Sequence, residues 1–234
     1  PELITTLLSL LEGHPSAGIA YCNSKIIDEN SRMIASYDYS SSLYCDHGLW
    51  EQDFHMKGKD FVADYMAFRN VIPNVSAVLF NSSVLKKHLH DCNFKYCADW
   101  ELYNRILLSH DIVFTNKLLN KFRRHVQTTR WHNHKSYAIE LKEKIALLKS
   151  LKNAMAPDEN AKSNINSSLR FIFANRHKYK RVERLCSKIA ELRNIYIKQL
   201  YIFGANDIAE RAVEVSLALN ITPIVIDTFK AGKI

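Results

Sequence analysis

Apolar and polar residues follow one another in short blocks, and their spacing changes from helical to strand-like along the chain. Residues 1–13 carry leucine and isoleucine at helical spacing and predict a short helix. Residues 17–28 form an apolar run typical of a buried strand, and residues 32–39 are suited to be its hairpin partner. Residues 40–60 are mixed polar and aromatic, which favours a loop. The N-terminal part therefore predicts a helix followed by a hairpin.

The middle of the chain continues this mixed pattern. A helix is expected over residues 60–72, followed by a short strand within residues 74–83 and a second helix over about 83–90. A third helix is expected to start at Asp99 and to end near residue 110. Residues 111–125 predict two short strands with a turn at Asn116 and Lys117.

The C-terminal part has a different character. Residues 137–155 and 164–198 are helical in pattern and rich in lysine and arginine, and residues 199–229 predict strand, glycine turn, helix and strand. Twenty Lys and Arg against six Asp and Glu give residues 117–200 a net charge of +14, whereas twelve against eighteen give the remainder −6. Charge segregated in this way concerns the choice of partners and not the fold.

Composition excludes several classes of protein. With 234 residues, 47% of them apolar, and only six glycines and five prolines, the chain predicts a globular protein with a real core. The absence of a long apolar run argues against a membrane-spanning helix. Five cysteines without a CxxC pair favour reduced thiols and a cytoplasmic setting. The sequence opens on Pro1 without a signal peptide and is expected to be a fragment.

Asp99 raises the main chemical question. An Asp at a helix N-cap accepts hydrogen bonds from the free amides of the first turn. The residue three positions later is Leu102, so there is no capping box. Capping alone explains Asp99 from this stretch, and a catalytic role needs supporting residues elsewhere.

Four segments provide that support through their order. A helix with a Pro-Glu start is followed by a strand that ends in an Asp-Glu-Asn turn, an Asn-x-Ile-x-x-x-Ser-x-x-x-Phe segment, the Asp99 helix and an aromatic-Arg-x-His segment. In this order, residues 1–130 resemble the C-terminal half of a family-two glycosyltransferase with the GT-A fold. The residues that carry the resemblance are Pro1, Glu2, Asn70, Ile72, Ser76, Phe80, Asp99, Phe122, Arg123, His125 and Thr128.

The resemblance implies the transfer of a sugar from a nucleotide-sugar donor, with inversion, to a glycan or lipid-linked acceptor in bacterial cell-surface polysaccharide synthesis. It implies that Asp99 is the general base and that Asn70, Ser76 and Trp100 belong to the acceptor or sugar pocket. It also implies that Arg123 and His125 bind the donor diphosphate, with His125 a possible ligand of a divalent metal, Mg or Mn.

The Asp-x-Asp motif of that family does not occur in residues 1–234. It would be expected upstream of Pro1, so the chain alone is expected to lack half of the donor site and to be inactive. Without the resemblance, His125 and the neighbouring arginines indicate a solvated basic strand end.

Residues 200–234 carry a second motif. Gly204 follows a predicted strand, and Asp227 ends the next one, which resembles the opening β-α-β unit of a Rossmann-like domain. Gly204, Asn206 and Asp227 are its candidate nucleotide-binding residues, with an NAD-like dinucleotide as the ligand. Asn206 stands where the motif has a second glycine, and its side chain intrudes on a bound phosphate. A purely structural β-α-β unit is the alternative.

The basic segment 131–199 also has two interpretations. It fits peripheral contact with an anionic membrane at the inner face of the plasma membrane, where a lipid-linked acceptor resides. It fits equally a solvated pair of connecting helices. No nucleic-acid-binding module accompanies the charge, so no nucleic acid is expected as a partner.

The sequence therefore predicts an α/β protein in three parts. These are an incomplete GT-A half-domain (1–130), a basic helical linker (131–199) and a truncated Rossmann-like β-α-β unit (200–234). Two other interpretations stay open. One is the nucleotide-binding Rossmann module of a sugar-modifying enzyme, and the other is a non-enzymatic basic helical interaction protein.

Overall fold

The computed structural model has an α/β fold, as predicted, and divides into two compact units. The first unit contains residues 1–124 and 143–170, and the second contains residues 125–142 and 171–234. The structure describes residues 2–28, 30–36, 48–123, 136–193, 199–203, 212 and 222–226.

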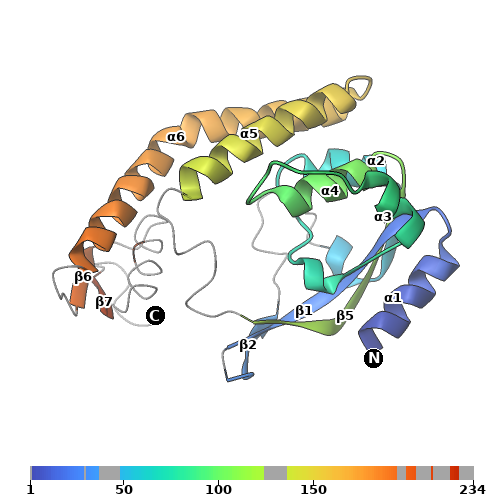
Figure 1. Cartoon of the computed structure of the whole chain (residues 1–234), viewed down its shortest axis with the longest axis horizontal. Helices are drawn as coiled ribbons and strands as arrows, with labels where there is room; N and C mark the ends of the chain where they lie inside the picture. Colours follow the sequence, from blue (N-terminus) through green and yellow to red (C-terminus); the bar gives the residue numbers. More distant parts are fainter. Residues whose placement is uncertain are drawn as a thin grey trace. The chain divides into compact units, whose positions relative to one another are not determined.

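A mixed β-sheet forms the centre of the first unit (Figure 1). Its strands run in the order β2-β1-β5-β3, and β4 pairs with another part of β1. β1 and β5 are parallel, whereas the other three pairs are antiparallel. The bounds are β1 (Ala17–Ile27), β2 (Met33–Ser36), β3 (Phe54–Met56), β4 (Val78–Phe80) and β5 (Asp111–Arg123). The hairpin predicted within residues 17–39 is confirmed by β1 and β2.

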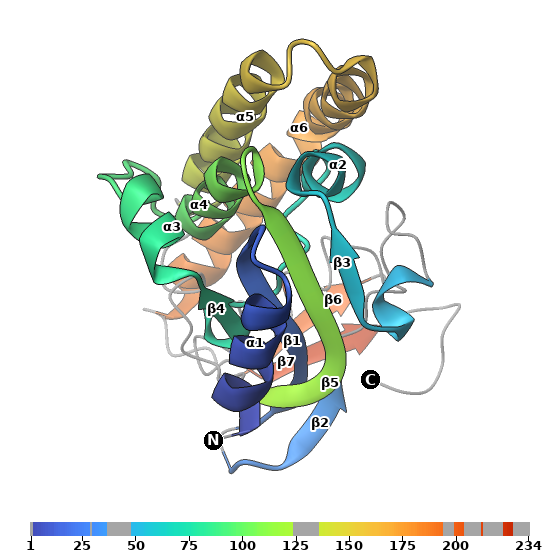
Figure 2. The ribbon, with the colours of Figure 1, turned by 90° about the vertical axis from the view of Figure 1, so that its right-hand side faces the viewer.

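Helices surround this sheet. α1 packs against β1, β4 and β5 (Figure 2), while α4 contacts β1 and α2 contacts β5. The bounds are α1 (Glu2–Gly13), α2 (Gly58–Phe61), α3 (Ser82–His88) and α4 (Ala98–Leu107), with short helical turns η1 (Leu49–Glu51), η2 (Val62–Met66) and η3 (Val75–Ala77). η2 is a π-helical turn that directly continues α2. The helices predicted at residues 1–13 and 83–90 are confirmed.

Both faces of the sheet are covered, which explains the almost continuous burial along β1. Under α1, Leu7 packs with the small side chains of Ala20 and Cys22. On the alternate positions, the ring of Tyr21 lies 4.6 Å from that of Phe114. The strand period of two thus sends small residues toward the helix and aromatic residues toward the opposite face.

Two predicted segments are corrected by the structure. Residues 54–56, within the predicted loop, form the edge strand β3, where Phe54 stacks on Phe114 with ring centroids 5.1 Å apart. Residues 111–123 form one strand and not two. Asn116 and Lys117 are exposed and lie at a shift in register, because Cys22 pairs with Thr115 but the next residue pairs with Leu118. The polar pair forms a bulge after which the ladder resumes.

Two long helices follow, α5 (Ser136–Ala154) and α6 (Glu159–Arg193), and the predicted interruption near Pro157 separates them. Residues 143–170 belong to the first unit. There the Asn164 amide donates to the Ala63 carbonyl at 3.0 Å, and the Ser168 hydroxyl donates to the Ala67 carbonyl at 2.8 Å. Part of the segment predicted as a linker is therefore packed on the η2 turn.

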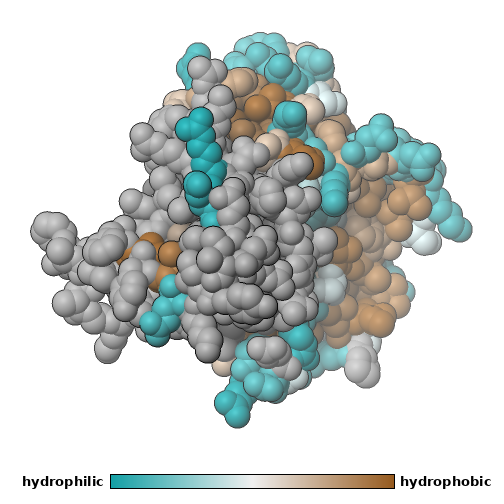
Figure 3. Space-filling view, turned by 60° about the vertical axis from the view of Figure 1, so that its left-hand side comes forward, coloured by the Kyte–Doolittle hydropathy of each residue, from teal (hydrophilic) through white to brown (hydrophobic). Residues whose placement is uncertain are grey.

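The second unit contains the parallel strands β6 (Gln199–Phe203) and β7 (Thr222–Ile226), which pair in register from Gln199 with Thr222 to Phe203 with Ile226. These are the two strands predicted for the β-α-β unit. In the part of the chain that the structure describes, no helix combines the length and the apolar character needed to cross a membrane. Hydrophobic side chains are exposed among hydrophilic ones on the face drawn in Figure 3, as is usual for globular proteins.

Candidate functional site

Asp99 lies in the first turn of α4, two residues after the N-cap, which is the position that the sequence predicts for it. The helix begins at Ala98, and the N-cap residue is Cys97, whose side chain makes no capping hydrogen bond. The Asp99 carboxylate instead accepts a 2.7 Å hydrogen bond from the backbone amide of Trp100. The predicted N-cap role of Asp99 is thus corrected. Its place in the first turn still puts its charge at the positive end of the helix dipole.

The amides that precede α4 are bound by a residue far away in the sequence. Glu143, near the middle of α5, accepts hydrogen bonds from the backbone amides of Lys95 and Tyr96 at 2.8 Å each and of Cys97 at 3.0 Å. Its side chain is buried. Glu143 thus fixes the backbone that leads into α4 and satisfies the amide of its N-cap residue, Cys97.

Asp99 lines a cleft with a volume of about 450 Å³, here called the Asp99 cleft. Its apolar residues include Val75 and Leu89, which are 52% and 65% exposed and thus available to a ligand. Lys95 contributes an exposed ammonium group, 5.7 Å from the centre of the Tyr96 ring. The lining residues are Val75, Leu89, His90, Cys92, Lys95, Tyr96, Ala98, Asp99, Leu102 and Arg105.

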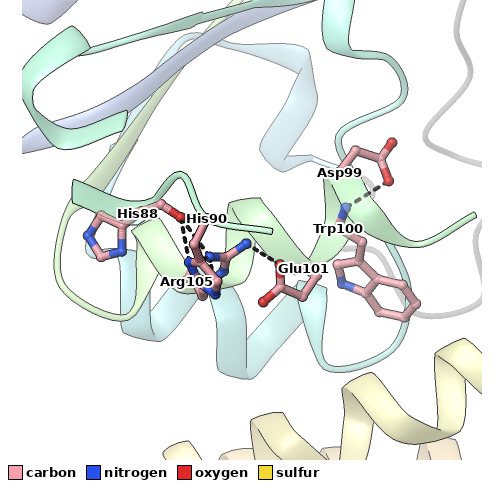
Figure 4. Close-up of polar contacts among 6 residues, drawn as sticks. All are labelled: His88, His90, Asp99, Trp100, Glu101 and Arg105. Carbon is pink, nitrogen blue, oxygen red and sulfur yellow. Dashed lines mark hydrogen bonds and ion pairs between the residues drawn. The ribbon is translucent and has the colours of Figure 1, made fainter. Parts of the chain in front are cut away.

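The polar side of the cleft is organised around Arg105 (Figure 4). Its guanidinium donates to the His88 carbonyl at 2.6 Å, forms an ion pair with Glu101 one turn earlier in α4, and contacts the ring of His90. Burial lowers the pKa of His88, and the nearby positive charges, including that of Arg105, lower it further. The arrangement holds the segment between α3 and α4 against α4.

Trp100 leaves the helix on the side opposite to Asp99 (Figure 4). It is 3% exposed, and its indole donates a 3.2 Å hydrogen bond to the Met66 carbonyl. It is absent from the lining of the Asp99 cleft. Trp100 therefore anchors the start of α4 in the core, which does not fit the expected contact with a sugar.

The negative charge of Asp99 acts on one buried neighbour. Burial raises the pKa of Tyr103 far above its usual range, and the nearby Asp99 carboxylate raises it further. Tyr103 is fully buried. The phenol therefore stays protonated at physiological pH and cannot act as a base beside Asp99.

Ser76 lies next to Val75, which lines the cleft, and is itself exposed. Its hydroxyl donates a hydrogen bond to the side-chain oxygen of Asn74 at 3.0 Å and accepts one from the side-chain amide of Asn120 at 3.2 Å. Asn120 also donates to Ser24 at 3.1 Å, and both Asn120 and Ser24 are buried. This polar network orients the Ser76 hydroxyl from inside the sheet.

The other predicted site residues have structural contacts or lie outside the described part. The Asn70 side chain accepts a 3.1 Å hydrogen bond from the Ile72 amide and shapes the turn before Pro73. Arg123 donates to the Asp28 carbonyl at 2.7 Å and to the Ser31 hydroxyl at 3.0 Å, so it ties β5 to the β1–β2 turn. Outside the described residues lie His125, Gly204, Asn206 and Asp227.

Glu143 is not among the residues predicted for the site, although the sequence carries a signal for it. Glu143, Leu147 and Leu151 follow one another at a spacing of four, so they share one face of α5, and both leucines are buried. An acid on a core-facing stripe must find hydrogen-bond donors. The donors could not be identified, because they are backbone amides and carry no side-chain signature.

Neither a metal-binding group among the described residues nor a similarity to known proteins identifies the function of this site. Among the described residues, no group of three or more His, Cys, Asp and Glu side chains is arranged to hold a metal ion. The one metal-ligand candidate of the sequence, His125, lies outside the described residues, so the expected divalent metal stays a prediction. No family model matches this chain, and no curated protein matches it.

Proposed function

We propose that this chain carries the acceptor side of an inverting GT-A glycosyltransferase, with Asp99 as the general base. The observation that carries the proposal is the position of Asp99, which lies in the first turn of α4 and lines a cleft of about 450 Å³. The order of the motifs in residues 1–130 supports the same assignment.

The cleft residues suit this chemistry. An acceptor hydroxyl donates a hydrogen bond to the Asp99 carboxylate, which takes the proton as the hydroxyl oxygen attacks the anomeric carbon of the donor. The new C–O bond forms as the bond to the diphosphate breaks on the opposite side of the sugar, and the nucleoside diphosphate leaves. Exposed Val75 and Leu89 provide apolar surface for the sugar rings, and Lys95 attracts negatively charged substrates.

The donor is expected to be a nucleotide sugar and the acceptor a glycan or a lipid-linked glycan. A divalent cation would neutralise the charge of the leaving diphosphate.

The test is the Asp99→Asn variant, measured in the natural protein that carries this sequence. The amide has the same shape but is a far weaker base, so we expect a loss of transfer of about 100-fold or more, with donor affinity retained. Asp60→Asn serves as the matched control, because Asp60 is an exposed carboxylate on α2 outside the cleft. Unchanged transfer in Asp99→Asn would exclude the base assignment.

A further inference from the structure

We infer that Glu143 is a positioning residue for Asp99, a role that rests on the proposed function of Asp99. Glu143 lies on α5, in the segment that the sequence predicts to be a linker. Its carboxylate fixes the backbone that leads into α4. The catalytic helix is therefore held in place from outside the predicted catalytic half-domain.

The contact is a clamp on three consecutive amides. One carboxylate oxygen accepts from Lys95, and the other accepts from both Tyr96 and Cys97, at 2.8 to 3.0 Å. Hydrogen bonds that involve an ionised acceptor are about twice as strong as neutral ones. Three such bonds from adjacent residues leave the backbone before α4 little freedom to rotate.

Because Glu143 is buried, it depends on the loop amides as much as they depend on it. Glu143 is only 8% exposed, and burying a carboxylate is costly unless protein donors replace its hydrogen bonds to water. The amides that it binds lie at the N-terminal end of α4, where the helix dipole favours a negative charge. The loop thus satisfies the charge of Glu143, while Glu143 satisfies donors that the loop would otherwise leave unpaired.

The clamp acts on Asp99 through a short stretch of backbone. Asp99 follows Cys97 by two residues, and Trp100, the next residue, is anchored to Met66 by its indole. Asp99 is therefore held between two fixed points on opposite sides. Misplacing a reacting group by about 1 Å costs on the order of 100-fold in rate.

A purely stabilising Glu143 would have the same contacts, so the test must separate geometry from stability. Glu143→Gln keeps the shape of the side chain but removes its charge and places an NH₂ group against a backbone amide. We expect kcat to fall about tenfold or more, with KM for donor and acceptor within about twofold, because the base is displaced while the binding surfaces remain. Amide hydrogen exchange at residues 95–97 should become faster in the same variant.

Two control variants match this change. Leu148→Val removes one buried methylene on α5 and lowers stability without touching the clamp. Glu159→Gln removes a carboxylate from the exposed start of α6. Both should retain kcat and the exchange rates of residues 95–97. If Glu143→Gln does not fold, Glu143→Asp keeps the charge but shortens the reach, and the same two readouts apply.

The outcomes separate this inference from the proposed function. Unchanged kcat in a folded Glu143→Gln protein, or unchanged exchange at residues 95–97, would overturn the positioning role. An equal loss of kcat in Leu148→Val would also overturn it, since a general loss of stability would then explain the effect. Absence of transfer in the natural protein that carries this sequence would refute the proposed function, while the exchange measurement would still decide whether the clamp exists.

Discussion

The indole of Trp50 donates a 2.7 Å hydrogen bond to the hydroxyl of Tyr21 inside the core of the sheet-bearing unit. Trp50 is 4% exposed and Tyr21 is fully buried. Tyr21→Phe removes the hydroxyl that accepts this hydrogen bond, so the buried indole N–H of Trp50 loses this acceptor. We expect the free energy of unfolding to fall by about 1–3 kcal/mol, measured by urea denaturation.

Tyr103→Phe is the matched comparison for that experiment. The hydroxyl of Tyr103 is also buried, but it has no hydrogen-bond partner among the described residues. Removing it should change stability by less than about 0.5 kcal/mol or even increase it, because an unpaired polar group leaves the core. Equal losses in the two variants would contradict the importance of the Trp50 hydrogen bond.

Asp111 should make stability depend on pH in acid. Burial raises its pKa, but hydrogen bonds from Ser16, Lys57 and His55 outweigh this effect and lower the pKa from 3.8 to about 2. A depressed pKa stabilises the folded state above the ordinary pKa, and this contribution is lost as the pH falls from about 4 to about 2. Its size is about 2 kcal/mol.

Denaturation of wild type and Asp111→Asn at several pH values tests this expectation. The variant should be less stable by about 2 kcal/mol at pH 7, and the difference should shrink below about pH 4. Asp60→Asn, in which an exposed carboxylate is neutralised, should show almost no difference at either pH. A constant deficit for Asp111→Asn at all pH values would show that packing, and not charge, is responsible.

The Asn120 amide should matter more for stability than its exposed partner does. Asn120→Ala removes the amide that donates hydrogen bonds to Ser24, Asn74 and Ser76, of which Ser24 and Asn74 are buried. The free energy of unfolding should fall by about 1–3 kcal/mol. Ser76→Ala removes only the exposed end of the network and should cost less than about 1 kcal/mol. Thermal unfolding of the two variants checks the order, and the reverse order would contradict it.

Gly58 should not tolerate a side chain. A Cβ atom there would lie 1.9 Å from the carbonyl oxygen of His110 and 2.2 Å from that of Leu107, and neither backbone atom can move aside easily. We expect Gly58→Ala to lose about 3 kcal/mol or more, or to be insoluble. A Cβ at Gly13 meets nothing within 4 Å, so Gly13→Ala should stay within about 1 kcal/mol of wild type.

The sequence predicts most of the elements near α1, β1 and α3, because periodicity and turn residues agree there. It fails at β5, where Asn116 and Lys117 have the composition of a turn but form a bulge. The decision between a turn and a bulge depends on the partner strand, since β1 continues alongside and keeps the chain extended. The sequence likewise predicts a loop at Phe54, because β3 exists only through its pairing with β5, which is more than 50 residues away.

The candidate site was predictable only in part. Asp99 and Ser76 are selected only through the order of motifs that carries the resemblance, because the stretch around Asp99 alone indicates no more than a helix cap. The supporting residues could not be selected in the same way. Glu143 binds the amide of Lys95, 48 residues away in the sequence, and Asn120 binds the hydroxyl of Ser76, 44 residues away. Local sequence patterns carry no information on contacts over such separations.

The span of the Glu143 contacts has a consequence for biosynthesis. Glu143 follows the amides that it binds by 46 to 48 residues. A chain that leaves the ribosome from its N-terminus therefore exposes α4 well before the residue that completes its start has emerged. Until then, the amides of Lys95, Tyr96 and Cys97 lack the acceptor that Glu143 provides, so the start of α4 is completed only after this part of α5 has been synthesised.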